Sequence, residues 1–492
     1  MTRYRQRGAD NPLRDLLAWC GSNGIPRVFW NKEDPANFDV FKDVAAEFDF
    51  VFTTDAASVP RYRAVLGHDR VYTLPFAAQP AIHNPTLDGI RRDLPLCFAG
   101  SWRPDKYPAR VADTAMLLDV AMDRGLHVYD RFHGTPDGEG KRFPPQYGRA
   151  VQGSLDYDRM LTAYRSYQVF LNVNSVHDSP TMFSRRVFEL LACKSPIVSS
   201  ESAGIRQTFG SLVKVARDPS EARAAIAQLL DDADRRERFA HAGYRVVQSE
   251  HTYSHRLAAI LRTIGVPAAV EEAPLVSLVA EVTSVQGVPE LLDTARRQTH
   301  APIELVLTVD PGRISAADVR KCGAGVDGVV VLELPGTMPP GERRDQAIAR
   351  SRGAWLAFLG GLDCYGAHFV FDSLLAVRFT DAAIIGKRTT YCFVRDSDEM
   401  LLRQPGQAHR HVQRVASGTL LVRRDVFDDV HFAAMAGDLD AAFQAECVRR
   451  GLRIYSSDPY NYLAVLPHMS SAELGDDHRH VRQMLDLGLV MI

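Results

Sequence analysis

Residues 169–200 constrain the fold more than any other stretch of this chain, because they read as strand, polar loop, helix and strand. Val169–Val173 is a short apolar run that predicts a buried strand, and Asn174–Ser179 is a polar loop. Ser179 followed by Pro180 is typical of a helix start, with a capping hydroxyl before a proline at the first helical position. Strands that alternate with helices predict a parallel sheet, so this stretch indicates the α/β class.

A carboxylate stands among apolar residues in the helix that follows. Glu189 lies between Phe188 and Leu190, and a buried carboxylate is costly unless something pairs with it. One partner is Arg185, four positions back, and the spacing alone favours this ion pair. The other is a ligand such as a ribose diol, because open α/β sheets bind ligands at the carboxyl ends of their strands and helix starts favour phosphate. The flanking segments favour the ligand.

The same order of strand and polar edge recurs towards the N-terminus. Three apolar runs each end in polar residues: Arg27–Trp30, Phe50–Thr53 and Val71–Phe76. The carboxyl ends of parallel strands meet at one edge, which is the edge that binds ligands. The first run is followed by Lys32, Glu33 and Asp34, which could face an acceptor as catalytic residues. Equally, they could form a structural turn in which Asp34 caps a helix.

A second group of strands begins at Leu96–Gly100 and leads into a basic turn. A glycine at a strand end lets the backbone approach a phosphate, and cations just after it can neutralise the phosphate charge. Gly100, Arg103 and Lys106 are therefore candidate ligands of a phosphate, and Arg110 is a weaker one. The alternative is an ordinary solvated turn.

The polar loop before the predicted helix start carries His177 and Asp178. A histidine at this place could polarise a leaving oxygen. It could also bond the backbone, which is the more frequent role of a loop histidine. Both residues are catalytic candidates.

These segments resemble the nucleotide-sugar half of two-domain (GT-B) glycosyltransferases, in particular the spore-maturation-type CgeB-like group. The resemblance rests on residues 169–200, on SEHTYSHR at 249–256, and on the strings FWNKEDP and LPFAAQPAIHNP near the N-terminus. In related family 4 enzymes two glutamates lie eight positions apart, and the second holds the donor ribose. Glu189 matches the second glutamate, but Thr181 stands where the first would be. The sugar contact and the retention of anomeric configuration implied by family 4 are therefore open.

The resemblance also implies roles for the remaining candidates. Family 4 enzymes place an arginine and a lysine on the donor diphosphate, and Arg103 and Lys106 are the corresponding residues. The predicted helix start at Ser179 would hold the same diphosphate, and Thr181 and Arg185 would belong to the same donor site.

The domains that the resemblance predicts are two GT-B-type Rossmann-like lobes. Residues 1–93 would be a partial, truncated acceptor lobe, since only about three strands precede the proline-bearing stretch 79–95. Residues 94–265 would bind the nucleotide sugar. A lobe this short exposes a sheet edge, through which an oligomer could form.

Residues 266–274 read as a linker, and residues 275–492 resemble a family 2, GT-A-like glycosyltransferase domain. Such domains hold a divalent cation through an Asp-x-Asp at the end of an apolar strand. Here the strand Ala354–Leu359 is followed by Asp363 alone, so we expect a degenerate domain that has lost its metal site. The other carboxylates of interest there are Asp310, Asp438 and Asp440.

Bulk properties exclude several classes of protein. A net charge of −2 over 492 residues gives no reason to expect nucleic-acid binding. The seven cysteines are scattered, which indicates reduced thiols and neither a disulfide frame nor a zinc site. No apolar run approaches the roughly 20 residues that span a bilayer. We therefore expect a cytoplasmic protein, peripheral at the inner face of the membrane if its acceptor is lipid-linked.

The resemblance thus implies an enzyme that moves a sugar from a nucleotide-diphospho-sugar to a glycan or lipid-linked acceptor, in cell-surface polysaccharide or glycan assembly. It would need no metal or further cofactor. One alternative is a non-catalytic scaffold or carbohydrate-binding partner, favoured by the short first lobe and the incomplete metal motif. Another is metal-dependent transfer by the C-terminal domain through Asp363 and Asp438.

Overall fold

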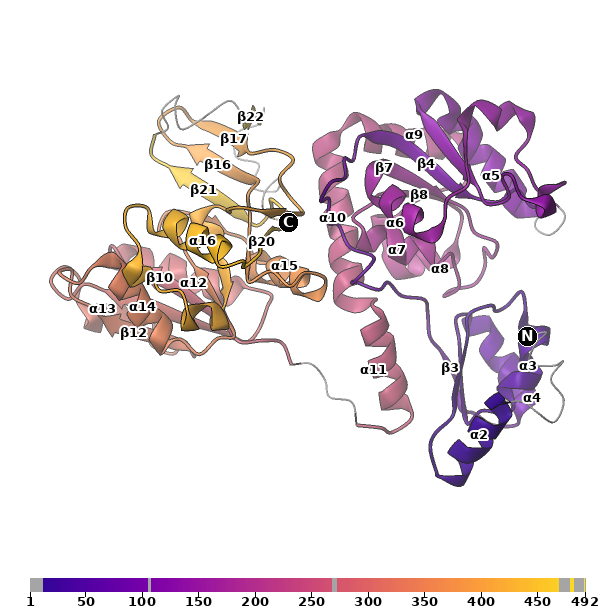
Figure 1. Ribbon diagram of the computed structural model, residues 1–492, viewed down its shortest axis with the longest axis horizontal. Helices are drawn as coiled ribbons and strands as arrows, with labels where there is room; N and C mark the ends of the chain where they lie inside the picture. The colour runs from indigo at the N-terminus through magenta and orange to yellow at the C-terminus, as the bar shows by residue number, and fades with distance from the viewer. Residues whose placement is uncertain (1–11, 105–107, 268–271, 469–477, 482–490, 492) are drawn as a thin grey trace. The chain divides into compact units, whose positions relative to one another are not determined.

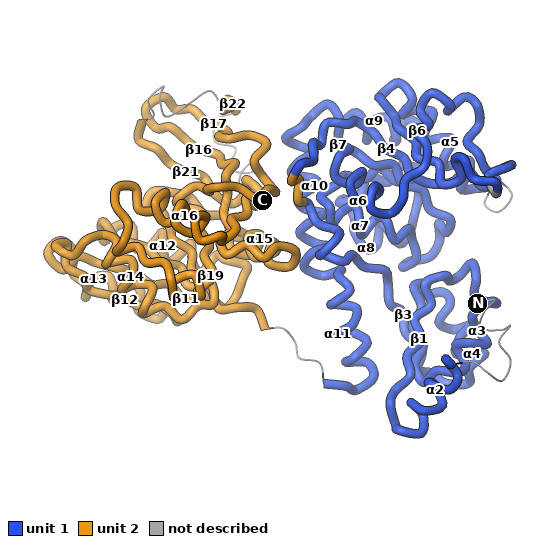
Figure 2. The backbone as a smooth tube through the Cα atoms, in the orientation of Figure 1, with its two compact units in different colours: residues 1–85, 89–270 blue, residues 86–88, 271–492 orange. Residues whose placement is uncertain are grey.

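A computed structural model describes residues 12–104, 108–267, 272–468, 478–481 and 491. The chain divides into two compact units, which we call unit 1 (residues 1–85 and 89–270) and unit 2 (residues 86–88 and 271–492) (Figure 2). Parallel sheets flanked by helices confirm the expected α/β class. Among the described residues, no helix combines the length and the apolar character needed to cross a membrane.

A three-stranded parallel sheet, in the order β1-β2-β3, forms the first lobe of unit 1, residues 12–85 (Figure 1). Phe29, Val51 and Val71 point to the same side of this sheet and pack with Phe38 and Tyr62. These last two residues belong to α3 and α4, so the helices cover that face. The elements are α2 (Pro12–Ser22), β1 (Val28–Asn31), α3 (Phe38–Ala45), β2 (Phe50–Thr53), α4 (Val59–Leu66) and β3 (Val71–Thr73).

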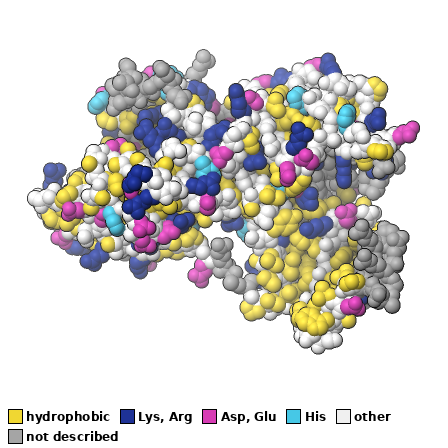
Figure 3. All heavy atoms as spheres, viewed as in Figure 1, with side chains coloured by type: hydrophobic (Ala, Val, Ile, Leu, Met, Phe, Trp, Pro, Cys, Tyr) yellow, Lys and Arg dark blue, Asp and Glu magenta, His cyan; other side chains and the backbone are white. Residues whose placement is uncertain are grey.

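Large apolar side chains are exposed on the first lobe. Leu16 and Trp19 of α2 are 54% and 57% exposed, and Figure 3 shows a broad hydrophobic area over this lobe. Among the described strands β1 and β3 each pair with β2 alone, so the sheet has free edges, as the sequence predicts.

Six parallel strands, in the order β6-β5-β4-β7-β8-β9, form the middle lobe, residues 89–267. The strands are β4 (Leu94–Gly100), β5 (Leu126–Asp130), β6 (Val151–Gly153), β7 (Tyr167–Asn172), β8 (Ile197–Ser200) and β9 (Lys214–Ala216). The helices are α5 (Pro108–Ala121), α6 (Tyr157–Ser166), α7 (Arg186–Ala192), α8 (Ala203–Phe209), α9 (Pro219–Asp231), α10 (Ala233–Glu250) and α11 (Tyr253–Thr263).

Helices cover both faces of this sheet, and β7 shows why its centre, Val169–Leu171, is apolar. Successive side chains of a strand point to opposite faces. Phe170 packs in a core with residues of α6, α7 and α8, whereas Val169 and Leu171 pack in a second core with α5 and α9. A strand buried on both faces favours apolar residues at successive positions, which is the pattern of Val169–Leu171. Asn172 follows at the carboxyl end, where its side-chain amide donates to Oγ of Ser199 at 2.9 Å.

The last helix of unit 1 returns to the first lobe. The ring of Tyr253 in α11 lies edge-on to Trp30, with centroids 6.1 Å apart. Nη2 of Arg256 donates to the carbonyl oxygen of Phe76 at 2.8 Å, and Ala78 forms a β-bridge with Thr252. The two ends of unit 1 are therefore packed together.

The predicted helix start at Ser179-Pro180 is wrong. The helix α7 begins only at Arg186, and residues 174–185 form a loop. The hydroxyl of Ser179 accepts a hydrogen bond from the backbone N–H of Met182 at 2.9 Å and donates to Oδ1 of Asp55 at 2.6 Å. Ser179 thus closes a turn and ties this loop to the first lobe.

An eight-stranded mixed sheet, in the order β12-β11-β10-β13-β19-β15-β20-β18, is the centre of unit 2. Its strands are β10 (Val276–Glu281), β11 (Ile303–Val309), β12 (Val329–Glu333), β13 (Trp355–Phe358), β15 (Ile384–Gly386), β18 (Arg410–Val412), β19 (Leu421–Arg423) and β20 (Ile454–Ser456). The helices are α12 (Val288–Arg297), α13 (Ala316–Cys322), α14 (Pro340–Arg350), α15 (Phe369–Leu375) and α16 (Leu439–Arg449).

A second, five-stranded sheet in the order β14-β21-β16-β17-β22 completes unit 2. Its strands are β14 (Cys364–Tyr365), β16 (Thr390–Val394), β17 (Glu399–Arg403), β21 (Tyr462–Leu466) and β22 (His478–His480). The short segment 86–88 also belongs to this unit, because Leu87 donates its backbone N–H to the carbonyl of His409 at 2.8 Å.

Candidate functional site

A cavity of about 900 Å³ opens in unit 1 at the carboxyl ends of β1, β4, β5 and β7. This is the sheet edge at which open α/β folds bind ligands. Its polar and charged wall is made by Lys32, Glu33, Ser101, Arg103, Arg110, Tyr129, Arg131, Asp156, Tyr157, Tyr164, Asn174, Ser175, Ser184, Arg185, Arg186 and Glu189.

Positive charge dominates this wall. Its described residues include one lysine and five arginines against three carboxylates, those of Glu33, Asp156 and Glu189. A concave site lined by one sign of charge attracts ligands of the opposite sign. The cavity is therefore suited to an anion with several negative charges.

Glu189 is the buried carboxylate of the site, with 3% of its surface exposed. The hydroxyl of Tyr164 donates to its Oε2 at 2.9 Å, and Nε of Arg185 lies 2.8 Å from its Oε1. The ion pair with Arg185 is the one that the sequence spacing favours. The carboxylate nevertheless lines the cavity, so one group has both partners inside the protein and access to a ligand.

A chain of polar contacts runs from Glu189 to the end of β4. Tyr164 donates to Glu189 and accepts from Nε of Arg186 at 3.3 Å. Arg186 in turn donates through Nη1 to the carbonyl oxygen of Ala99. Burial raises the pKa of Tyr164, so its hydroxyl keeps its proton and acts as a donor. This chain fixes the charges of Arg186 and Glu189 on the floor of the cavity.

A buried histidine supports the same end of the cavity. The backbone N–H of Gln79 donates to Nδ1 of His83 at 3.0 Å, and burial lowers the pKa of His83. The neutral ring therefore carries its proton on Nε2, which lies 3.0 Å from the hydroxyl oxygen of Tyr157. Tyr157 accepts this bond and keeps its own proton available at the cavity wall.

Lys32 forms the wall on the side of the first lobe. Its Nζ lies 4.2 Å from the ring centroid of Trp30 and 5.0 Å from that of Tyr253. Two aromatic faces thus hold the ammonium group in place. Burial, and after it the positive charge of Arg185, lowers the pKa of Lys32.

Gly100 occupies the end of β4, where space is short. A Cβ atom at this position would lie 2.9 Å from the ring of Phe98 and 3.5 Å from Nη2 of Arg110. Glycine therefore leaves room for the ring of Phe98. Arg110 lies beside this strand end, where its Nη1 donates to the carbonyl of Ser101 at 2.8 Å.

The structure brings several predicted residues together in the cavity and leaves others outside it. The predicted residues that line the cavity are Lys32, Glu33, Gly100, Arg103, Arg110, Arg185 and Glu189. Lys106 lies outside the described residues. Arg131, Tyr157, Tyr164 and Arg186 also line the cavity, although sequence reasoning gave them no ligand role. Arg131 is a cation directly after a strand, and a cation just after a strand is the signal that selected Arg103 and could have selected Arg131 too.

Asp34 is a correction to the sequence expectation. It is 0% exposed and is not part of the cavity wall, so it neither faces an acceptor nor caps a helix. Thr53 donates to its Oδ2 at 2.6 Å, and Asn31 donates to its Oδ1 at 2.8 Å. Asp34 orders the end of β1, next to Lys32.

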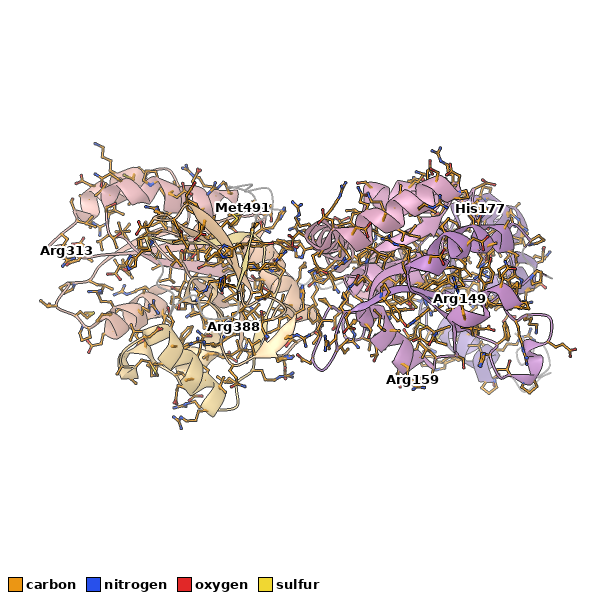
Figure 4. The ribbon with its side chains drawn as sticks, turned by 90° about the horizontal axis from the view of Figure 1, so that it is seen from above. Arg149, Arg159, His177, Arg313, Arg388 and Met491 are labelled. Carbon is orange, nitrogen blue, oxygen red and sulfur yellow. The ribbon has the colours of Figure 1, made fainter. Side chains whose placement is uncertain are left out.

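The loop residues of the expected catalytic site also lie outside the cavity wall. Nε2 of His177 (labelled in Figure 4) is 2.9 Å from Oδ2 of Asp113 on α5, and the neighbouring Asp178 is exposed. Thr181 donates to the carbonyl of Thr54 at 2.9 Å, so like Ser179 it bonds the first lobe. The side chains of His177 and Thr181 thus make contacts that stabilise the fold.

Asp363, the remaining residue of the incomplete metal motif, is held by unit 2 itself. The hydroxyl of Tyr462 donates to its Oδ2 at 2.8 Å, and the backbone N–H of Val465 donates to its Oδ1 at 3.1 Å. Burial raises the pKa of Asp363. Both oxygens thus have structural partners.

The other three carboxylates of unit 2 also have partners inside the fold. Asp438 caps α16 by accepting from the backbone N–H of Asp440 at 3.1 Å. Asp440 pairs with Arg344. Asp310 accepts from the backbone N–H of Gly312 at 3.0 Å, which closes a turn.

Residues 113–262 match a protein-family model described as glycosyl transferase-like. The matched segment contains Arg131, Tyr157, Tyr164, Arg185 and Glu189, and so most of one side of the cavity. The match supports the expected transferase. No curated protein matches the chain.

Similar solved structures include TarS, sucrose-phosphate synthase and TarM. Residues 1–349 of TarS from S. aureus share 14% identity, with 39% of this chain and 60% of that chain covered and a TM-score of 0.32. Sucrose-phosphate synthase from Thermosynechococcus elongatus shares 15%, with 48% and 64% covered and a TM-score of 0.34. TarM shares 12%, with 48% and 49% covered and a TM-score of 0.34. The chain spans less than two thirds of each protein, and at these scores the likeness carries no argument about the site.

Proposed function

We propose that this chain transfers a sugar from a nucleotide-diphospho-sugar to a glycan or lipid-linked acceptor, and that the cavity of unit 1 is the donor site. The observation that carries the proposal is the cavity itself. It combines a buried carboxylate with six cationic side chains at the carboxyl ends of the strands, within and beside the segment that matches a glycosyl transferase-like family. A nucleotide-diphospho-sugar offers both matching groups, a diol and a diphosphate.

The two kinds of group suit two parts of the donor. Glu189 would accept hydrogen bonds from the ribose diol, since a carboxylate has about four lone-pair sites and, among the described residues, only Tyr164 and Arg185 occupy them at hydrogen-bonding distance. Arg103, Arg110 and Arg131 would bind the diphosphate, because arginine suits phosphate oxygens. Charge that builds on the leaving diphosphate during transfer would be stabilised by these fixed cations.

We propose further that transfer needs no metal ion. In metal-dependent transferases a divalent cation offsets the charge of the donor phosphates. Here arginines at the ends of β4 and β5 supply positive charge in that place. The occupied oxygens of Asp363 support the same conclusion for unit 2, which we regard as a degenerate GT-A-like domain fused to a CgeB-like GT-B part. Cell-surface polysaccharide or glycan assembly is the proposed setting.

The first prediction concerns the carboxylate that would hold the ribose. Glu189→Gln keeps the shape of the side chain but removes its charge, so the donor should lose charge-assisted hydrogen bonds. We expect the affinity for the preferred nucleotide sugar to fall about 10- to 100-fold. A thermal-shift panel of UDP-, GDP- and ADP-sugars finds the donor, and calorimetric titration of both proteins measures the change.

The matched control is Glu221→Gln on α9, which removes a carboxylate paired with Arg217 away from the cavity. It should leave donor affinity unchanged. Each titration is run with EDTA and with manganese. If nucleotides stabilise the protein only with manganese, the result favours metal-dependent sugar transfer by unit 2. If no nucleotide stabilises the protein, the result favours a non-catalytic scaffold. Equal affinities in the two variants would remove Glu189 from the donor site.

A further inference from the structure

Lys32, in the wall of the cavity, has an unusual environment for a lysine. It is half-buried, and the part of the chain that the structure describes places no carboxylate at ion-pair distance from its Nζ. Its Nζ instead makes cation–π contacts with the rings of Trp30 and Tyr253. Burying a charge without a counter-charge costs free energy, so such an arrangement needs a compensating partner.

A second cation of the cavity wall, Arg185, makes this arrangement more costly. Arg185 lowers the pKa of Lys32 by its like charge, and both side chains line the cavity. Arg185 has a carboxylate partner, Glu189, at 2.8 Å, whereas the described residues place no carboxylate at ion-pair distance from Lys32. An anion placed between Lys32 and Arg185 would remove the repulsion and supply the missing counter-charge.

The position of Lys32 separates it from the arginines assigned to the diphosphate. Lys32 follows β1 of the first lobe, whereas Arg103 and Arg131 follow β4 and β5 of the middle lobe. The cavity thus has a cation on its first-lobe wall and a group of arginines on its middle-lobe wall. The group of arginines is sufficient to bind a single diphosphate, so the cation on the first-lobe wall is available for another anion.

We propose that Lys32 and Arg185 form a second anion subsite, which binds a carboxylate or phosphate group of the acceptor. This inference rests on the proposed function, because it assigns the acceptor side of the same cavity. It makes the acceptor an anionic molecule, such as a glycan bearing acidic sugars or a phosphorylated carrier. The fixed ammonium group would orient the acceptor towards the donor.

The test uses inorganic phosphate as the probe and the full chain saturated with the nucleoside diphosphate that binds best. Calorimetric titration should show that phosphate still binds to the wild type. Lys32→Met should weaken phosphate binding at least about tenfold and change nucleoside diphosphate affinity by less than about threefold. Lys32→Arg keeps the charge and should restore most of the binding. Lys42→Met, on α3 of the same lobe, is the matched control and should resemble the wild type.

Other outcomes overturn the subsite. If phosphate does not bind the saturated wild type, or binds Lys32→Met equally well, Lys32 holds no second anion. If Lys32→Met loses nucleoside diphosphate as strongly as phosphate, Lys32 belongs to the donor diphosphate. If no nucleotide binds, the proposed function fails by itself, and phosphate titration of the unliganded variants still decides whether Lys32 binds anions.

Discussion

At the scale of single residues, Asp34 shows how the first lobe keeps a charge-bearing group in its interior. Its carboxyl group is 0% exposed and accepts hydrogen bonds from Asn31, Thr53 and Tyr62. Burial raises the pKa of Asp34 from 3.8 to about 6, although the hydrogen bonds from Thr53 and Tyr62 act in the opposite direction. The carboxyl group therefore stays protonated in the folded protein to a higher pH than in the unfolded chain.

This pKa predicts a pH dependence of stability. Between pH 3.8 and about 6 the folded state binds more protons at Asp34 than the unfolded state. The free energy of unfolding therefore falls as pH rises through this window, by up to about 3 kcal/mol at neutral pH. Asp34→Asn removes the titration, so its stability should fall less between pH 4 and pH 7. Urea denaturation at a series of pH values measures the difference.

Asp39→Asn is the control for this experiment. Asp39 is exposed on α3, and its hydrogen bond from Lys42 lowers its pKa, so its effect has the opposite sign. It should not flatten the decline between pH 4 and pH 7. Parallel profiles of Asp34→Asn and the wild type would contradict the raised pKa.

Glu189 shows which contacts of a single residue could be predicted from the sequence. Its spacing from Arg185 predicted an ion pair, and its surroundings predicted a ligand site; the structure contains the ion pair at a cavity wall. The sequence could not reveal Tyr164 and His83 as neighbours of Glu189. These residues come from α6 and from the stretch before β4, and only the packed fold brings them together.

At the scale of elements, apolar strands were predictable and the loop after β7 was not. The centre of β7, Val169–Leu171, is apolar at successive positions because both faces of the strand are covered, so its sequence is distinctive. Ser179-Pro180 follows a local rule for helix starts. Here Ser179 bonds Asp55, which lies 124 residues away in the sequence. Thr181 bonds Thr54, 127 residues away. Tertiary contacts at such separations override a local signal.

The same loop yields a prediction about the junction of the two lobes. The hydroxyl of Thr181 donates to the carbonyl of Thr54 and accepts from the backbone N–H of Ala56, both at 2.9 Å. Thr181→Val keeps the shape and leaves both backbone groups without this partner. We expect the free energy of unfolding to fall by about 1–3 kcal/mol, measured by urea denaturation.

Ser166→Ala is a suitable control because Ser166 is half-buried and its hydroxyl donates within α6, to the carbonyl of Thr162 at 3.0 Å. Its effect should stay within about 0.5 kcal/mol. Hydrogen exchange adds a local readout, since Thr181→Val should reduce amide protection in the segment 54–58. Equal stability of the two variants would show that the contact does not stabilise the junction.

At the scale of the whole molecule, the cavity lies entirely within unit 1. We therefore expect a shortened chain of residues 1–270 to bind the preferred nucleotide sugar with an affinity within about threefold of the full chain. Calorimetric titration of both proteins measures this, and far-UV circular dichroism checks that the shortened chain is folded. A folded but non-binding unit 1 would mean that donor binding depends on unit 2.

The return of α11 to the first lobe decides how this protein can be recombined with its relatives. A chimera that exchanges only residues 1–93 would separate Trp30 from Tyr253 and the carbonyl of Phe76 from Arg256. Functional grafts must therefore carry residues 250–265 together with the new N-terminal half. In evolution, these two distant stretches of sequence are expected to be inherited as one exchangeable block.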